Sequence, residues 1–91
     1  MKIKDSAHST KHDSLGRAVR ETRARRGMSQ EGLGFHAGLH RNYVGAVERG
    51  EINPTFRILL KLACGLRVPL SELLVLAEQR HRETYREPLG S

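Results

Sequence analysis

The sequence predicts an all-α domain of five helices, and two observations support this prediction. Aromatic residues make up only 4% of the chain, tryptophan is absent, and no two β-branched residues are adjacent, so the runs that strands favour do not occur. Five aliphatic segments follow one another instead, each opened by a capping residue or a proline. A chain of 91 residues can build one small core. We therefore expect a flexible polar arm at 1–13, a domain at 14–78, and a C-terminal helix extension and tail at 79–91.

The first two expected helices lie close together in the chain. One is predicted over 15–26, with Asp13 or Ser14 as its N-cap. Ser29 then caps a short helix at 30–37, QEGLGFHA, and Gly38 is a natural residue to close it.

Three further helices follow the same rules. Residues 40–49, HRNYVGAVER, carry apolar residues at helical spacing and end at Gly50. A proline-containing turn leads to the segment FRILLKLACG at 56–65, whose apolar surface predicts a central packing helix. Pro69 then opens a fifth helix over 70–87 that frays near its end.

The second and third expected helices have the features of a helix-turn-helix. Two helices that cross closely need a small residue at the crossing and left-handed backbone geometry at the turn. Gly34 and Gly38 supply these two features. The apolar residues expected to hold both helices on the core are Leu33, Ala37, Leu39, Val44 and Val47.

Three segments carry a family resemblance: MSQEGLGFHAG, LHRNYVGAVERGEINPT and LLKLACGLRVPLSELL. With this spacing, residues 15–75 resemble the lambda-repressor/Cro type of helix-turn-helix domain, also called the xenobiotic response element family. The resemblance implies a five-helix lambda-repressor-like bundle that acts as a sequence-specific, double-stranded DNA-binding transcriptional regulator. The short single domain and the segment RNYVGAVERG also resemble the controller proteins of restriction-modification systems.

The resemblance places the first turn of the third helix in the DNA major groove. It implies that Arg41, Asn42 and Tyr43 contact bases there, and that Ala46 touches a thymine methyl group from the next turn. An arginine can fork onto guanine and an asparagine can pair with adenine. Gly45 is also expected on the groove-facing side, where it leaves the second turn nearly bare. Alternatively, Arg41 binds phosphate or solvent, and Tyr43 packs at the helix edge.

Contacts to the DNA backbone are implied around this turn. The residues concerned are Gln30, His40, Arg49, Asn53 and Arg57. Gln30 begins the second helix, whose N-terminus favours an anion, although it could equally be a simple polar helix start. The resemblance also implies a structural ion pair between Arg23 and Glu48, which would tie the third helix to the first.

Three positions depart from the family pattern. Gly32 stands where glutamate is usual, so the reciprocal half of a capping box is lost. His40 stands where serine, threonine or aspartate is common, which predicts a weakly capped third helix. Arg67 stands where glycine is frequent, and Gly65 lies two residues earlier. We therefore expect the fourth helix to end early.

The fifth expected helix is more apolar than one buried face requires. The residues Leu73, Leu74, Leu76 and Ala77 are predicted to form a homodimer interface. A two-fold pair of recognition helices would match a palindromic operator, a short inverted repeat. Alternatively, this helix completes a monomeric core. A second functional hypothesis is an antitoxin-like protein that binds a partner toxin and autoregulates its operon.

Charge and composition narrow the remaining classes. The net charge is +6, and most of the basic excess lies in residues 1–49, which suggests a polyanionic partner. The five histidines are dispersed and no nucleophile has a paired base, so we expect no metal, no cofactor and no enzymatic activity. No apolar stretch reaches the roughly 18 residues that cross a membrane. Since the single cysteine, Cys64, cannot form an internal disulfide, we expect a cytoplasmic protein.

Overall fold

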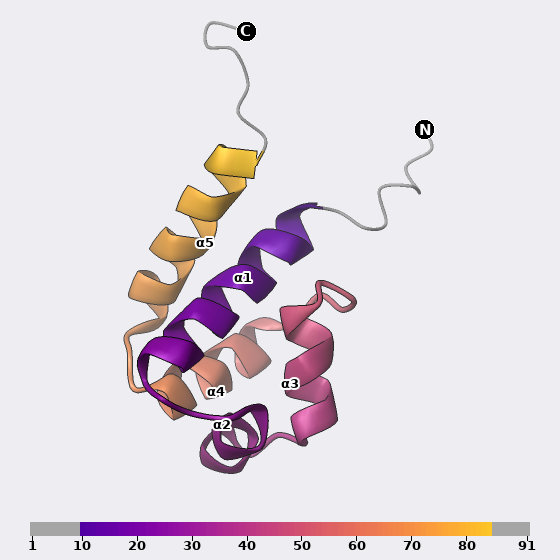
Figure 1. The fold of residues 1–91 in the computed structure, drawn as a ribbon, viewed down its shortest axis with the longest axis vertical. Coiled ribbons are helices and arrows are strands. Elements are labelled where there is room, and N and C mark those ends of the chain that lie inside the picture. The colour runs from indigo at the N-terminus through magenta and orange to yellow at the C-terminus, as the bar shows by residue number, and fades with distance from the viewer. Residues whose placement is uncertain (1–9, 85–91) are drawn as a thin grey trace, which may run out of the picture.

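The computed structural model describes residues 10–84, which form five helices connected by short turns (Figure 1). The helices are α1 (Thr10–Arg25), α2 (Gln30–Ala37), α3 (Arg41–Glu48), α4 (Phe56–Leu66) and α5 (Leu70–Thr84). The described part of the chain contains no strand, so the all-α prediction is confirmed. The ends of the predicted arm and tail lie outside the described residues.

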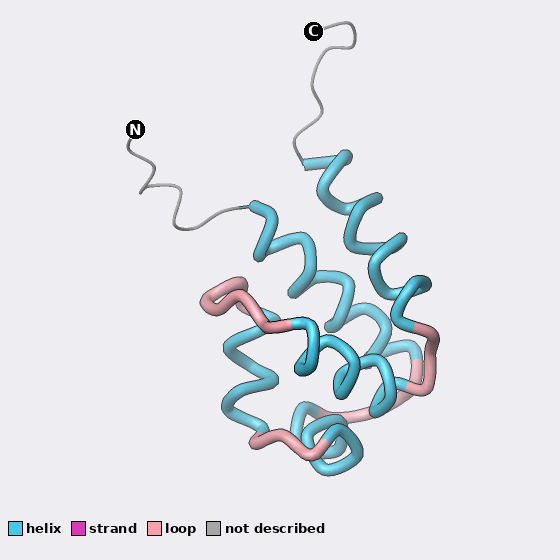
Figure 2. Tube along the Cα trace, turned by 180° about the vertical axis from the view of Figure 1, so that it is seen from behind, coloured by secondary structure: helices cyan, strands magenta, loops and turns pink. Residues whose placement is uncertain are grey.

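The helices form two groups. α1 and α5 lie side by side and run in opposite directions, while α3 packs against α1 and α2 packs against both α3 and α4 (Figure 1). Seen from behind, α4 crosses the front of the molecule between α3 and α5 (Figure 2). All five helices contribute to one core, whose largest fully buried side chains are Val19, Leu33, Val44, Val47, Leu62, Leu66 and Leu73.

The first four helices end in the same hydrogen-bonded turn. In each, a backbone N–H just after the helix donates to a carbonyl five residues earlier, as Glu51 does to Ala46 at 3.0 Å and Leu39 does to Gly34 at 2.8 Å. This turn needs one residue with positive φ. Glycine fills it after α1, α2 and α3, whereas Arg67 fills it after α4 with φ 63°.

The end of α4 lies one residue beyond the predicted end, at Leu66 rather than at Gly65. Gly65 is buried inside the helix, and a Cβ at this position would lie 2.9 Å from the Cβ of Ala37 in α2. The glycine is therefore needed for close packing of two helices, and Arg67 accepts the strained turn position instead.

The beginning of α1 is also earlier than predicted. The helix starts at Thr10, so residues 10–13 are helical, and Asp13 lies in the first turn rather than before it. A Cβ on Gly50 would stand 3.2 Å from the Cα of Asp13. The start of α1 thus packs against the turn that follows α3. A carboxylate in the first turn is also favourable because it faces the positive end of the helix dipole.

Candidate nucleic-acid interface

The unit formed by α2, α3 and their turn has helix-turn-helix geometry. A Cβ on Gly34 would lie 2.5 Å from the carbonyl oxygen of Leu39, so no side chain fits at this crossing. Gly38 has φ 73° and closes α2. Val44 and Val47 of α3 are buried. These contacts hold one face of α3 on the core and leave its N-terminal turn at the surface.

Two predicted base-reading residues lie together on that exposed turn. Arg41 and Asn42 are both exposed, and their side chains leave the start of α3. The Nη1 atom of Arg41 lies 3.5 Å from Oε1 of Glu31 in α2, a long contact between two exposed groups. Tyr43 is half-buried and packs against the core, which favours the alternative position at the helix edge.

His40 caps the recognition helix, contrary to the prediction of a weak cap. Its Nδ1 atom accepts the backbone N–H of Asn42 at 2.9 Å. The imidazole nitrogen therefore replaces the hydroxyl or carboxylate oxygen of a common N-cap residue. A ring nitrogen that accepts a hydrogen bond cannot also donate one, so Nε2 is the nitrogen of His40 able to donate while this cap is formed.

The second turn of α3 also differs from the prediction. Gly45 is buried rather than open to the groove. A Cβ on Gly45 would lie 3.0 Å from Nη1 of Arg49 and 3.4 Å from Oε1 of Gln30. These two polar side chains cover the position, and only the half-buried Ala46 remains partly open in this turn.

A buried polar network joins α3 to α1 and α2. Arg23 Nε donates to Glu48 Oε2 at 2.6 Å, and Arg23 Nη2 donates to Glu48 Oε1 at 3.0 Å. The expected ion pair is thus present, and its hydrogen bonds raise the pKa of the Arg23 guanidinium above its usual value. Gln30 Nε2 donates to Glu48 Oε1 at 2.9 Å. Its carboxamide therefore buttresses the scaffold, while its backbone N–H remains at the start of α2.

The other residues predicted to contact the DNA backbone lie between the end of α3 and the start of α4. Arg49, Asn53 and Arg57 are exposed. Arg49 forms a bidentate ion pair with Glu51, at 2.8 Å and 3.2 Å. This bond lowers the pKa of the Glu51 carboxyl and raises that of Arg49.

Two features of this surface were not predicted from the sequence. Glu51 was not recognised as the partner of Arg49, although acid and base two residues apart around a helix-ending glycine are a usable signal. Arg17 and Arg20 of α1 share a surface hollow with Arg49. Their proximity depends on how α1 crosses α3, which local sequence does not reveal.

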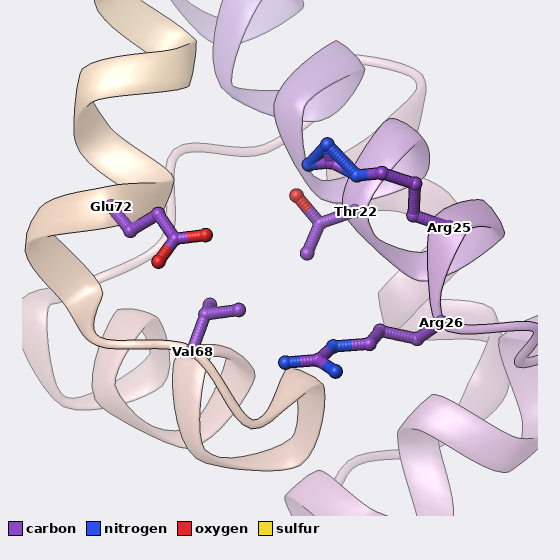
Figure 3. Close-up of a pocket in the computed structure, with 5 residues that line it drawn as sticks. All are labelled: Thr22, Arg25, Arg26, Val68 and Glu72. Atoms are coloured by element: carbon purple, nitrogen blue, oxygen red, sulfur yellow. The ribbon is translucent and has the colours of Figure 1, made fainter.

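A second hollow lies between the end of α1 and the start of α5 (Figure 3). Arg26 borders it and donates to the carbonyl oxygens of Leu66 and Arg67 at 3.0 Å and 2.8 Å. These bonds satisfy the end of α4. Arg25 and Arg26 face Glu72 across the hollow, so its lining carries both signs of charge (Figure 3).

The predicted dimer residues on α5 do not share one face. Leu73 is 1% exposed within the core of its own chain, so its assignment to an interface is wrong. Leu76 and Ala77 are half-buried against the same core. Leu74 is 42% exposed, and its neighbour Val75, which the prediction omitted, is 52% exposed.

Within residues 10–84, no group of three histidine, cysteine, aspartate or glutamate side chains could hold a metal ion. None of the helices over the same residues is long and apolar enough to cross a membrane.

The fold and the exposed first turn of α3 define a helix-turn-helix protein. A family model described as "Helix-turn-helix" matches residues 19–73. The chain belongs to this family and is a DNA-binding transcriptional regulator.

Two individual relatives are similar to this chain over about two thirds of its length. Control protein C.SmaI of Serratia marcescens is 43% identical over 60 residues, covering 66% of this chain and 71% of that protein. The HTH-type transcriptional regulator YgzD of Bacillus subtilis is 36% identical over 61 residues, covering 67% and 92%. These relatives are regulators rather than enzymes.

Solved structures of controller proteins have a similar fold. The restriction-modification controller protein C.AhdI from Aeromonas hydrophila is 45% identical with a TM-score of 0.67, covering 68% of this chain and 94% of that one. The controller protein C.Esp1396I has a TM-score of 0.76 over 82% of this chain and 97% of its own. At 24% identity, this second likeness concerns the fold.

Proposed function

We propose that this regulator binds a short inverted repeat in double-stranded DNA as a homodimer and controls genes of a restriction-modification system. The observation that carries the proposal is the exposed first turn of α3, with Arg41 and Asn42 at the surface above a buried anchor at Glu48. The similarity to controller proteins supports the biological role.

Base reading falls to Arg41 and Asn42. The Arg41 guanidinium can donate two hydrogen bonds to guanine, and the Asn42 carboxamide can both donate to and accept from adenine. Each such pair contributes about 1–3 kcal/mol of discrimination. The long contact between Arg41 and Glu31 is easily exchanged for a base because both groups are exposed.

Contacts to the sugar-phosphate backbone of the DNA would set the position of α3 along the groove. The N-terminus of α2 at Gln30 presents backbone N–H groups suited to a phosphate. His40 has Nε2–H left to donate, since its Nδ1 is occupied. Arg49, Asn53 and Arg57 provide exposed polar groups between the C-terminal end of α3 and the first turn of α4.

In the proposed homodimer, a second copy of the chain covers exposed apolar side chains of α4 and α5. Leu74 and Val75 lie on α5, and Phe56 and Leu60 lie one turn apart on α4, at 66% and 46% exposed. Two-fold pairing through these residues would present two recognition helices to the two halves of an inverted repeat.

Selection of bound duplexes from a random pool at physiological salt tests the proposal. The expected product is an inverted repeat with half-sites about one helical turn apart. Arg41→Ala should then relax preference at one base of each half-site, whereas Arg49→Ala should weaken selected and random duplexes alike. Recovery of no common sequence, or of one without two-fold symmetry, would contradict the proposal.

A further inference from the structure

The turn after α3 holds an acidic side chain beside a cationic one. Gly50, with φ 74°, lets the Gly50 N–H donate to Val47 and the Glu51 N–H donate to Ala46, both at 3.0 Å. This hydrogen-bonded turn fixes the backbone of Glu51 relative to Arg49. The carboxylate therefore starts from a defined place next to the guanidinium.

The ion pair uses the fork-shaped edge of the guanidinium. Arg49 Nε and Nη2 donate to the two oxygens of Glu51 at 2.8 Å and 3.2 Å. The third nitrogen, Nη1, lies over Gly45, where the missing Cβ leaves room for it. The hydrogen bonds hold the pKa of the Glu51 carboxyl below its usual value, so the carboxylate is charged at neutral pH.

A DNA phosphate can use the same edge, formed by Nε and Nη2 of Arg49. Guanidinium groups bind carboxylates and phosphates through the same pair of parallel hydrogen bonds. The side chains of Arg49 and Glu51 are 59% and 53% exposed, so the pair is open to a ligand. Arg49 also lines the hollow that it shares with Arg17, Arg20, Asp13 and Glu48. Both anions cannot occupy one edge.

Building on the proposed DNA binding, we propose that Glu51 is an internal competitor of the DNA backbone for Arg49. The phosphate gains the paired contact with Nε and Nη2 of Arg49 only by displacing the Glu51 carboxylate. Glu51 thereby limits the affinity of the protein for any duplex, because the contact carries no base information. The pair as a whole has almost no net charge before binding, so it reduces the dependence of affinity on salt.

Glu51→Gln tests this role in a double-mutant cycle with Arg49→Ala. The probe is a labelled mixed-sequence duplex two helical turns long, titrated at several salt concentrations. In the wild-type background, Glu51→Gln should tighten binding by about 3- to 10-fold and steepen the salt dependence by about one phosphate contact. In the Arg49→Ala background, the same change should tighten binding by less than about 2-fold.

Glu31→Gln is the matched control for the loss of an acidic group near the proposed DNA surface. Its carboxylate meets Arg41 through one contact of 3.5 Å, so its removal should not reproduce the coupling with Arg49. Equal tightening by Glu51→Gln with and without Arg49 would overturn the proposal, since it would show simple repulsion of DNA. Unchanged or weaker binding by Glu51→Gln would overturn it as well.

The proposed function can fail separately. A wild-type chain that binds no duplex at low salt would contradict DNA binding itself, whereas a binding wild type with an unaltered Glu51→Gln variant contradicts only the competitor role. The Arg49 Nε–H resonance provides a direct readout in the free protein. It should shift in Glu51→Gln and, on addition of duplex, in the wild type.

Discussion

Arg23 at the end of α1 and Glu48 at the end of α3 form a bidentate ion pair in which the carboxylate is only 2% exposed. This pair and the bond from Gln30 to Glu48 hold the base of the recognition helix on two other helices. Because a buried charge without its partner is costly, the pair constrains both stability and the position of α3.

We expect Arg23→Ala to destabilise the fold by about 2–4 kcal/mol, since it strands the Glu48 carboxylate with one remaining amide partner. Arg23→Ala/Glu48→Ala should cost less than the sum of the two single changes, because the double variant leaves no unpaired charge. Urea unfolding of the four proteins measures this coupling. Additive costs would show that the two residues act independently.

A substitution in the turn after α4 is expected to stabilise the fold, whereas Arg23→Ala is expected to destabilise it. Arg67 adopts φ 63°, which costs a side-chain-bearing residue about 1–2 kcal/mol. Arg67→Gly should raise the free energy of unfolding by about 0.5–1 kcal/mol, because part of the relief is offset by the flexibility of glycine in the unfolded chain.

Gly38→Ala is the matched control for this change. Gly38 has φ 73°, and no atom lies near a Cβ built on it, so strain alone should destabilise the alanine variant. Thermal unfolding measures both proteins. A lower melting temperature for Arg67→Gly would mean that the arginine side chain contributes more than its backbone costs.

Much of the fold was predictable because its signals are local. Ser29, Thr55 and Gly38 mark helix ends by their own chemistry, and the structure places them as caps. Gly34 was recognisable because a helix crossing needs a small residue. The position of Gly65 carried the same kind of signal, but a helix end and a close helix contact both select glycine, and only packing against Ala37 separates them.

The site was less predictable where it depends on contacts between helices. The cover over Gly45 comes from Gln30 at the start of α2 and from Arg49 folding back along α3. Leu73 and Leu74 are neighbours with equal hydropathy, yet one is buried and the other exposed. Which of them faces α1 follows from the rotation of α5 about its axis, and a nearly all-apolar segment does not determine that rotation.

His40 provides a prediction at the start of the recognition helix. His40→Ala removes the acceptor for the Asn42 N–H and should destabilise the fold by about 0.5–2 kcal/mol. His40→Asn should restore most of this loss, because an asparagine oxygen caps the same position.

Thermal unfolding and the exchange rate of the Asn42 amide proton test the His40 variants together. Faster exchange in His40→Ala alone is the expected pattern, since the capping bond protects that proton. Equal stability and equal exchange in the wild type and His40→Ala would show that the bond does not hold the helix start.

Substitutions at the neighbouring residues Leu73 and Leu74 are expected to affect folding and association separately. Leu73→Ala should destabilise the chain by about 2–5 kcal/mol, because it opens a cavity in the core. Leu74→Glu should leave the fold of a single chain intact, since this side chain is 42% exposed, but it should place two carboxylates within the proposed dimer interface. Sedimentation velocity should therefore show a dimer for the wild type and a monomer for Leu74→Glu, with unchanged circular dichroism. A dimeric Leu74→Glu variant would move the interface away from this part of α5.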